Sequence, residues 1–529
     1  MSATETCRAL VEDLLDLGVR EAVLAPGSRS GPIALALAEA DRAGALRLHV
    51  RVDERTAGFL ALGLAKGSHA WVPVVTTSGT AVANLHPALL EARHSRVRVL
   101  ALTADRPARL RGTGANQTTD QVRIFPGIAY GEEPAAVHAL LAEADGPAHL
   151  NVELDEPLIE PGEWAPARRD DHPRTGPHVS FDGPPLEIAP HAVVVAGDDA
   201  GPQARLFAEQ AGLPLLAEPT SGARNGENAL VSYRPMLAAT PLARQIDQVI
   251  MFGHPTLSRP ITSLLGRTDL DVVVPAGDLR AFPHPPGHAR LVHPHAEPDG
   301  RAPDSWLEAW RTADAMATAA VDVVTTERPD GAPYVVARAV SAAVPPNGLL
   351  VVGSSNPVRD LDLVARPYTV GERRFVIGNR GLAGIDGTIS TAVGSALARQ
   401  PSRAIAYLGD LTFLHDANGL LIGPDEPRPD LTVVVASDDG GSIFTTLEQG
   451  DPAFAASFER VYATPTGADL GALCAAVGVP HRRLDATELA AALEEPVAGI
   501  RVLEVRVPRG TRRELGAAIN AAVEAAVQP

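Results

Sequence analysis

Short apolar runs alternate with longer amphipathic stretches along most of this chain. In the first part the runs lie near residues 20–25, 46–52, 72–76, 97–103 and 148–154, and helical patterns lie near 5–17, 31–40, 55–66 and 80–93. A short, continuous apolar run is typical of a strand buried on both faces, as in a parallel sheet covered by helices. The alternation of the two patterns therefore predicts a parallel α/β sheet with helices on both faces.

The same pattern recurs twice, so we expect an α/β fold with three parallel-sheet domains. Runs near 191–196, 213–217, 248–252 and 270–274 predict a second sheet, and runs near 348–352, 374–377, 404–408, 431–436 and 501–507 predict a third. A stretch rich in Pro, Arg, Asp and Gly indicates a linker. The predicted parts are a first domain at 1–165, a linker at 166–190, a central domain at 191–325 and a last domain at 334–529.

Composition and charge narrow the class of protein. The 529 residues carry a formal net charge of −18, which argues against a nucleic-acid surface. No apolar run approaches the length of about 18 residues that spans a membrane, and no signal peptide is indicated. Cys7 and Cys474 are expected to be reduced and buried, as in a cytoplasmic protein. The single lysine, Lys66, is expected on a helix surface, which disfavours Schiff-base chemistry.

Two acidic turns follow neighbouring strands of the predicted last sheet. Gly409-Asp410-Leu411 follows the run at 404–408, and Asp438-Asp439-Gly440-Gly441 follows the run at 431–436. Open α/β sheets bind their ligands at the carboxyl ends of the strands. Two carboxylates beside a Gly-Gly turn suit Mg²⁺, which usually takes a few protein oxygens together with phosphate oxygens. The pattern therefore predicts a site for a metal and a diphosphate.

Four polar turns end strands of the predicted first sheet. They are Gly27-Ser28-Arg29-Ser30, Asp53-Glu54-Arg55, Thr77-Ser78-Gly79-Thr80, and Asp105-Arg106-Pro107 with Gly114-Ala115-Asn116-Gln117. A Gly turn at a helix N-terminus can bind an anion, and Arg29 can add a bidentate contact to a carboxylate. The turn at 27–30, taken alone, fits a helix cap with a surface arginine equally well. Because all four turns meet at one edge of the sheet, a common cleft is the better interpretation.

Several common nucleotide and hydrolase signatures are missing from the sequence. No GxGxxG fingerprint follows a predicted strand, which disfavours a nicotinamide dehydrogenase. No GxxxxGK[ST] loop and no GxSxG elbow occur, which disfavours P-loop triphosphatases and α/β-hydrolases.

The acidic turns resemble the thiamine-diphosphate motif of the decarboxylase and carboligase superfamily. Together with Asn379-Arg380-Gly381, Gly384-Ile385-Asp386-Gly387 and Ile443-Phe444, the turns are similar to the branch of that superfamily that acts in menaquinone biosynthesis. The resemblance covers the first and last domains almost throughout, and the central domain mainly in its strand pattern. It implies a transferase whose first domain binds the aminopyrimidine of the cofactor and whose last domain binds the diphosphate.

The resemblance implies a cofactor site built from both of these domains. Asp410, Asp438 and the carbonyl group of Gly440 would hold Mg²⁺, or Mn²⁺, against the diphosphate. Glu54 matches the glutamate that hydrogen-bonds a pyrimidine nitrogen and activates thiamine diphosphate, a role that needs a desolvated carboxylate. Ile385 matches the apolar residue that bends the cofactor. The implied cofactor-binding set is Glu54, Ser78, Gly79, Asn116, Gln117, Ile385, Gly409, Asp410, Leu411, Asp438, Gly440, Gly441 and Ile443.

The substrates that the resemblance implies are 2-oxoglutarate and isochorismate. The first would lose CO₂, and the resulting carbanion would add to the second in a 1,4 fashion, with Glu54, Arg29, Arg359 and Arg380 as catalytic residues. Arginine suits such polyanions because its planar guanidinium matches carboxylates. The implied substrate-binding set is Ser28, Arg29, Arg106, Asn116, Gln117, Arg280, Ser355, Arg359, Arg380, Ile443, Phe444 and Leu447.

One residue departs from the superfamily pattern, which usually has Asn in place of Asp438. We expect the metal to be retained and the diphosphate to be held less tightly, because a further negative charge faces it. Sites of this superfamily lie between the first domain of one subunit and the last domain of its partner, so a homodimer or homotetramer is expected. The alternatives are an acetolactate-synthase-like carboligase, a 2-oxoacid decarboxylase, or a non-catalytic ligand-binding relative. We expect the central domain to be structural.

Overall fold

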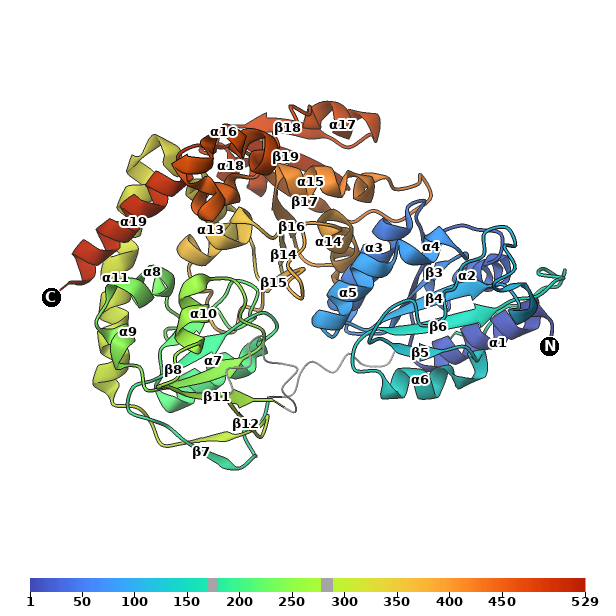
Figure 1. The fold of residues 1–529 in the computed structure, drawn as a ribbon, viewed down its shortest axis with the longest axis horizontal. Helices are drawn as coiled ribbons and strands as arrows, with labels where there is room; N and C mark the ends of the chain where they lie inside the picture. The colour runs from blue at the N-terminus through green and yellow to red at the C-terminus, as the bar shows by residue number, and fades with distance from the viewer. Residues whose placement is uncertain (169–178, 277–288, 529) are drawn as a thin grey trace.

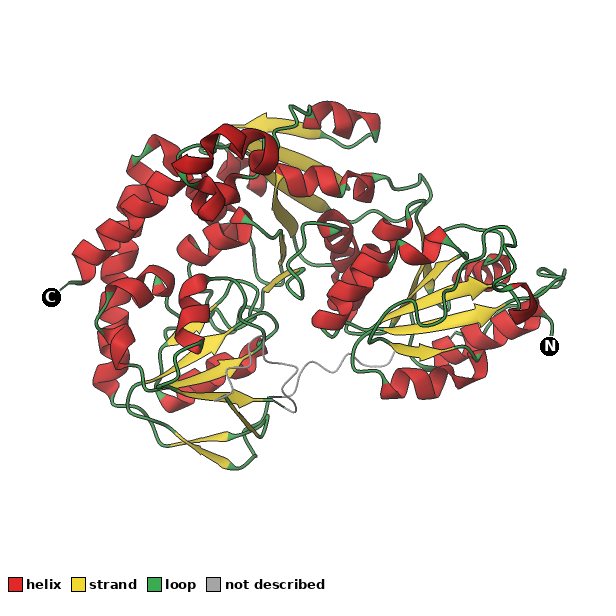
Figure 2. Cartoon of the chain, in the orientation of Figure 1, coloured by secondary structure: helices red, strands yellow, loops and turns green. Residues whose placement is uncertain are grey.

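The computed structural model describes residues 1–168, 179–276 and 289–528. The chain forms three domains, each built on a parallel sheet. The last domain lies between the first domain and the central domain (Figure 1). Helices cover both faces of the sheets, as Figure 2 shows. The predicted α/β class with three parallel sheets is confirmed.

The first sheet has the strand order β2-β1-β3-β4-β6-β5. Its strands are β1 (Glu21–Leu24), β2 (Arg47–Val50), β3 (Val72–Thr76), β4 (Val99–Asp105), β5 (Ala129–Gly131) and β6 (Ala148–Glu153). Its helices are α1 (Ala3–Asp16), α2 (Gly31–Arg42), α3 (Glu54–Ser68), α4 (Thr80–Ala83), α5 (His86–His94) and α6 (Val137–Glu143). The helix expected at 80–93 is divided into two, because a new helix starts at His86 with Pro87 in its first turn, where proline is tolerated.

The central sheet has the order β12-β11-β10-β8-β9. Its strands are β8 (Ala192–Ala196), β9 (Leu215–Ala217), β10 (Gln248–Phe252), β11 (Asp271–Pro275) and β12 (Arg290–Val292), and its helices are α7 (Gly201–Ala211), α8 (Tyr233–Ala239), α9 (Leu242–Gln245) and α10 (Arg259–Leu265). A separate two-stranded sheet pairs β7 (Pro185–Glu187) with β13 (Glu297–Asp299). The end of the expected linker is therefore ordered by a strand that follows the central sheet in sequence.

The last sheet has the order β15-β14-β16-β17-β19-β18. Its strands are β14 (Leu349–Val352), β15 (Phe375–Gly378), β16 (Ala404–Gly409), β17 (Leu431–Ser437), β18 (His481–Leu484) and β19 (Ile500–Arg506). Its helices are α11 (Asp304–Glu327), α12 (Ala332–Ala342), α13 (Asn356–Val364), α14 (Thr388–Arg399), α15 (Asp410–His415), α16 (Ala455–Phe458), α17 (Leu470–Ala476), α18 (Leu489–Glu494) and α19 (Arg512–Val527). With strands numbered along the chain, the first and last sheets have the same order.

The first and last domains share one hydrophobic core. Leu60 and Leu64 of α3 belong to the same buried cluster as Ile389 and Val393 of α14. The two helices follow equivalent strands, β2 and β15, of the two sheets. The apolar run after Glu54 is thus buried by a neighbouring domain as well as by its own sheet.

Glycines bring α3 and α14 into backbone contact. A Cβ atom on Gly63 would lie 2.2 Å from the Thr391 carbonyl oxygen, and one on Gly394 would lie 2.3 Å from the Leu60 carbonyl oxygen. The Ser395 hydroxyl donates to the Gly63 carbonyl oxygen at 3.0 Å. Each helix therefore needs glycine where it meets the other.

We expect Gly63→Ala to destabilise the protein by about 1–3 kcal/mol, because the added methyl group overpacks this contact. Alanine favours a helix by about 1 kcal/mol over glycine, so the effect runs against helix propensity. Gly516→Ala in α19 is the matched control, since a Cβ atom there meets nothing within 4 Å. Thermal unfolding should show a lower melting temperature for Gly63→Ala only. Equal or opposite shifts would contradict the role of the contact.

Candidate functional site

A cavity of about 310 Å³ opens at the carboxyl ends of β14, β16 and β17. The strand order reverses between β14 and β16, which is where open α/β sheets bind ligands. The cavity brings together all the candidate residues of the last domain. These are Ser355, Arg359, Arg380, Ile385, Gly409, Asp410, Leu411, Asp438, Gly440, Gly441, Ile443, Phe444 and Leu447.

Two carboxylates stand at the floor of this cavity. Asp410 opens α15 and is buried, and its Oδ1 and Oδ2 atoms accept from the N–H groups of Leu411 (2.7 Å) and Gly440 (3.2 Å). Burial raises the pKa of Asp410, and burial together with the charge of Asp410 raises the pKa of Asp438 to about 7. A cation between the two groups would relieve both effects.

The donor set fits a cation that shares its ligands with a bound molecule. Across the described ranges, 1–168, 179–276 and 289–528, no group of three or more His, Cys, Asp or Glu residues is arranged to hold a metal. Asp410 and Asp438 therefore need further oxygen ligands from the backbone and from a ligand. That composition matches Mg²⁺ in complex with a diphosphate.

Arg380 supplies a buried positive charge to the same cavity. Its side chain is 2% exposed, and its guanidinium donates to the hydroxyl groups of Ser354 (3.4 Å) and Thr256 (3.3 Å). Its Nε atom is buried without a hydrogen-bond partner. A buried cation held by neutral hydroxyls is suited to a carboxylate ligand.

The second arginine of the cavity, Arg359, stays cationic near neutral pH. It lies on α13 and donates to the Ser355 carbonyl oxygen at 2.8 Å. Burial, together with the charges of the neighbouring Arg380 and Arg234, lowers its pKa to about 10. Arg359 and Arg380 thus form one region of positive charge in the cavity.

The central domain contributes Thr256 to this cavity, a residue that the sequence analysis did not single out. Thr256 follows β10 and lines the cavity beside Arg380. Behind it, Glu218 accepts from the Leu257 N–H at 2.9 Å, and burial raises the pKa of Glu218 to about 8. A neutral carboxyl at this position leaves the charge of Arg380 available to a ligand.

An ion pair missed in the sequence also lines the cavity. Arg512 at the start of α19 forms a bidentate contact with Asp360 of α13, at 2.8 and 3.0 Å, and both side chains are buried. Cavity residues were predicted mainly from polar turns at strand ends, and neither Asp360 nor Arg512 belongs to such a turn.

The candidate residues of the first domain form a second cluster. Arg106 donates to the Ser78 hydroxyl and to the Asn116 carbonyl oxygen, both at 2.7 Å. Ser78 and Gln117 exchange hydrogen bonds of 2.9 and 3.1 Å. A Cβ atom on Gly27 would lie 2.3 Å from that of Thr77, so the turn before Ser28 presses against the turn that carries Ser78. These contacts bring three of the four turns together, and the common cleft expected from the sequence stays a prediction.

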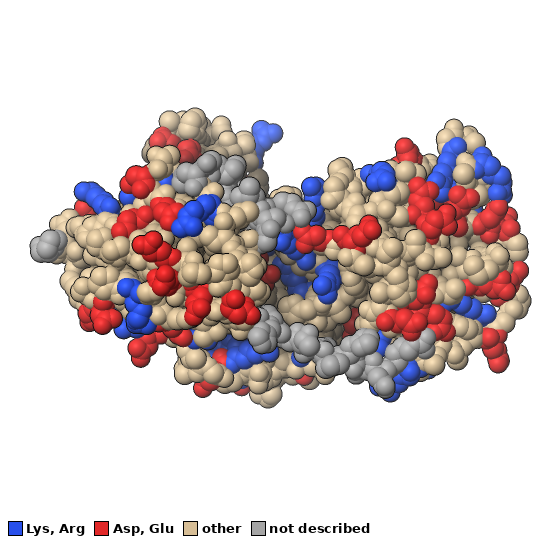
Figure 3. Space-filling model, turned by 90° about the horizontal axis from the view of Figure 1, so that it is seen from below, with Lys and Arg blue, Asp and Glu red and all other residues tan. Residues whose placement is uncertain are grey.

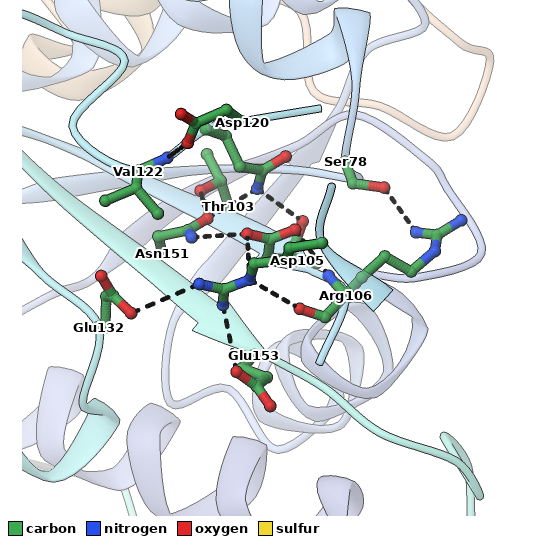
Figure 4. Close-up of polar contacts among 12 residues, drawn as sticks. Ser78, Thr103, Asp105, Arg106, Asp120, Val122, Glu132, Asn151 and Glu153 are labelled. Atoms are coloured by element: carbon green, nitrogen blue, oxygen red, sulfur yellow. Dashed lines mark hydrogen bonds and ion pairs between the residues drawn. The ribbon is translucent and has the colours of Figure 1, made fainter. Parts of the chain in front are cut away.

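Hydrogen bonds and ion pairs around the buried Asp105 hold the backbone of Arg106 in place (Figure 4). Asp105 accepts from the Arg106 N–H at 2.7 Å and from the Asn151 amide at 2.9 Å, and the Arg111 Nε atom lies 3.3 Å from the same carboxylate. Asn151 is buried within β6, where polar and apolar residues alternate, so it gave no distinct signal in the sequence. Arg111 lies in a loop and gave none.

Arg29 and Glu54 complete the first-domain set. Arg29 donates to the Leu154 carbonyl oxygen at 3.0 Å, and burial together with the charge of Arg29 lowers the pKa of Arg106. Glu54 is the first residue of α3, and Asn84 donates to its carboxylate at 3.2 Å. Glu54 is only partly buried in the single chain, so the desolvation expected for it is incomplete there.

The two clusters are not joined into one cavity within the described chain. Among the residues that line the last-domain cavity, none comes from the first domain. Arg280 lies outside the described residues, as do residues 169–178 of the linker expected at 166–190. Basic side chains gather in the hollow near the middle of the molecule, as Figure 3 shows. In the described ranges, no helix has both the length and the apolar character needed to cross a bilayer.

Comparisons with known proteins agree on one family. The description "Thiamine pyrophosphate enzyme, N-terminal TPP binding domain" matches residues 4–124. A protein of Nocardioides sp. named 2-succinyl-5-enolpyruvyl-6-hydroxy-3-cyclohexene-1-carboxylate synthase is 51% identical, with 98% of each chain covered. A protein of the same name from Kineococcus radiotolerans is 46% identical, with 99% of each covered.

A solved structure supports the fold. The crystal structure of benzoylformate decarboxylase from Polynucleobacter necessarius superposes with a TM-score of 0.63, covering 96% of this chain and 99% of its own. At 17% identity the likeness shows the shared fold alone.

We expect Asp438→Asn to stabilise the metal-free protein by about 1–3 kcal/mol at pH 8, because it removes one of two neighbouring carboxylates. The gain should shrink at pH 5, where a group with a pKa of about 7 is already neutral in the folded protein. Asp439→Asn is the control, since that carboxylate accepts from the Thr466 and Gly467 N–H groups. Thermal unfolding at both pH values measures the difference. A loss of stability in Asp438→Asn at pH 8 would count against the repulsion.

Proposed function

The chain belongs to the 2-succinyl-5-enolpyruvyl-6-hydroxy-3-cyclohexene-1-carboxylate synthase family, and on this premise we propose the reaction that it carries out. It is a thiamine-diphosphate-dependent transferase of menaquinone biosynthesis. Its proposed reaction is decarboxylation of 2-oxoglutarate and 1,4-addition of the remaining acyl unit to isochorismate. The observation that carries this choice of substrates is Arg380, a buried guanidinium held by hydroxyl groups beside the Asp410 and Asp438 carboxylates.

Polyanionic substrates need fixed cations from both clusters. In the last domain, Arg359 and Arg380 would bind carboxylates, with Ser355 as a polar partner and Phe444 and Leu447 as an apolar wall. In the first domain the corresponding groups are Ser28, Arg29, Arg106, Asn116 and Gln117. Arg280 of the central domain is a further proposed ligand for a carboxylate.

The proposed cofactor site divides between the same two domains. Asp410, Asp438 and the Gly440 carbonyl would hold Mg²⁺, or Mn²⁺, against the diphosphate, beside Gly409, Leu411 and Gly441. Ile385 and Ile443 would contact the rings from the last domain, and Ser78 and Gly79 from the first. The ring-binding part corresponds to residues 1–165 and the diphosphate-binding part to residues 334–529.

The chain's own groups would position and activate the cofactor. Bound thiamine diphosphate supplies a carbon nucleophile and accepts the electrons that loss of CO₂ leaves behind. Glu54 would hold a hydrogen bond to the pyrimidine ring, which controls where the proton of the aminopyrimidine lies. Arg29, Arg359 and Arg380 would orient the substrate carboxylates and offset the negative charge at the reacting centre.

We place the active site between two subunits. The last-domain cavity contains no first-domain residue in the described chain, and Glu54 is only partly buried there, which supports completion of the site by a partner. A homodimer is then the smallest active unit, and a homotetramer contains the same sites. The proposed location is the cytoplasm, which fits two buried, unpaired cysteines.

The proposed reaction is tested by following CO₂ release from 2-oxoglutarate with thiamine diphosphate and Mg²⁺, and by determining the mass of the product formed with isochorismate. We expect Glu54→Gln to lower turnover by about 100-fold or more, because the carboxylate that activates the cofactor is lost. Cofactor binding should persist, as measured by calorimetry. Wild-type turnover in Glu54→Gln would remove this residue from the mechanism.

The outcomes of this assay separate the alternatives. A product without the isochorismate ring would indicate another carboligase or a decarboxylase, and no CO₂ release under any condition would indicate a non-catalytic relative. Asp438→Asn should retain metal-dependent cofactor binding, and loss of that binding would contradict the assigned ligand set.

A site shared between subunits predicts complementation. Glu54→Gln and Asp410→Ala should each be inactive alone, because one lacks the first-domain group and the other the metal ligand. Co-expressed chains should regain activity, since a mixed dimer contains one site with both native groups. Each variant expressed alone is the control. No recovery in isolated mixed dimers would place the whole site within a single chain.

A further inference from the structure

The backbone that carries Arg380 is held by the first domain. Residues 379–387 connect β15 to α14 and contain no helix or strand. Within this segment, Gly381 and Leu382 each donate a backbone N–H to the carboxylate of Glu91, both at 2.8 Å. Glu91 belongs to α5 of the first domain and is 4% exposed. One buried carboxylate therefore fixes two successive peptide groups directly after Arg380.

The single lysine of the chain completes this contact. Lys66 of α3 donates from its Nζ atom to the Gly378 carbonyl oxygen at 2.6 Å, and the same atom lies 3.8 Å from Glu91. Its side chain is 10% exposed, so the expectation of a surface lysine was wrong. The reason is that α3 is covered by the last domain. Lys66 holds the segment before Arg380, and Glu91 holds it after.

Charge-assisted hydrogen bonds of this kind are stronger than neutral ones. Both side chains are largely buried, so removing either partner leaves the other buried without its counter-charge. A segment without regular structure takes its conformation from such outside contacts. Two first-domain residues therefore constrain the backbone on both sides of Arg380, while Ser354 and Thr256 hold its guanidinium.

We infer that Glu91 and Lys66 are positioning residues for Arg380, so that the first domain of a chain aligns the substrate-binding cation of its own last domain. This inference rests on the proposed role of Arg380 in binding a substrate carboxylate. The first domain would then position a substrate-binding residue of the last domain in addition to contacting the rings of the cofactor.

The test compares Glu91→Gln with Arg380→Ala in the purified holoenzyme. Glu91→Gln keeps the size of the side chain but presents an amide to one of the two N–H groups. We expect it to raise the KM of the substrate that Arg380→Ala affects by about 10- to 100-fold, with thiamine diphosphate affinity unchanged. The double variant should be no worse than Arg380→Ala alone, because both changes act through one group.

Ser395→Ala is the matched control. It removes the hydrogen bond from Ser395 of α14 to Gly63 of α3, and it leaves residues 378–382 untouched. We expect its KM values to equal those of the wild type. Lys66→Met provides a second route if Glu91→Gln fails to fold, and it should raise the same KM.

The outcomes separate the inference from the proposed function. If Arg380→Ala leaves both KM values unchanged, the proposed substrate role of Arg380 is wrong. If Arg380→Ala raises KM while Glu91→Gln and Lys66→Met do not, the positioning role is overturned. The positioning role is also overturned if the KM increases of Glu91→Gln and Arg380→Ala multiply in the double variant. It is overturned as well if Ser395→Ala raises the same KM equally, since the effect would then come from a general loosening of the interface.

Discussion

Backbone contact between α3 and α14 is the constraint on which the rest of the structure depends. Gly63 and Gly394 let the two helices approach until the backbone carbonyl groups of each helix meet the glycine of the other. The helices begin at the Glu54 turn and just after the Arg380 segment. Fixing one helix against the other therefore fixes two turns that carry proposed catalytic residues. The shared core around them stabilises both domains, so neither turn is set by its own domain alone.

Charge in the last-domain cavity is arranged in two opposite regions. The acidic pair at Asp410 and Asp438 lies at the strand ends, and the cations Arg359 and Arg380 lie along the same cavity. The surrounding acids offset these cations only in part, and one of them, Asp198, whose pKa burial raises to about 6, interacts electrostatically with Arg380. Glu218, the carboxyl group behind Thr256, has its pKa raised to about 8 by burial, so it stays largely neutral near pH 7. Asp360 is already paired with Arg512. Anion binding thus depends on which nearby acids are neutral or occupied.

Local patterns in the sequence predicted the strands and the strand-end turns. The run before Asp410 is β16, and the run before Asp438 is β17, because apolar residues there are buried on both faces. Parallel strands bring their ends together, which is why the last-domain residues share a cavity. Contacts between distant parts of the chain had no such signal. Glu91 meets Gly381 across 290 residues, and Lys66 meets Gly378 across 312, so neither pair appears in any local pattern.

The first and last sheets have the same strand order, and this has a consequence for how the residues at their strand ends can differ. Equivalent helices of two like domains face each other, as in the isologous contact of a symmetric dimer. Here a peptide chain joins the two partners, so they are always present in equal amounts. The turns of the first and last domains can therefore differ in sequence while the contact between α3 and α14 is kept. The last domain carries the Asp410 and Asp438 pair at its strand ends, and the first carries Ser78, Gln117 and Arg106 at the corresponding edge, a difference that two identical subunits could not have.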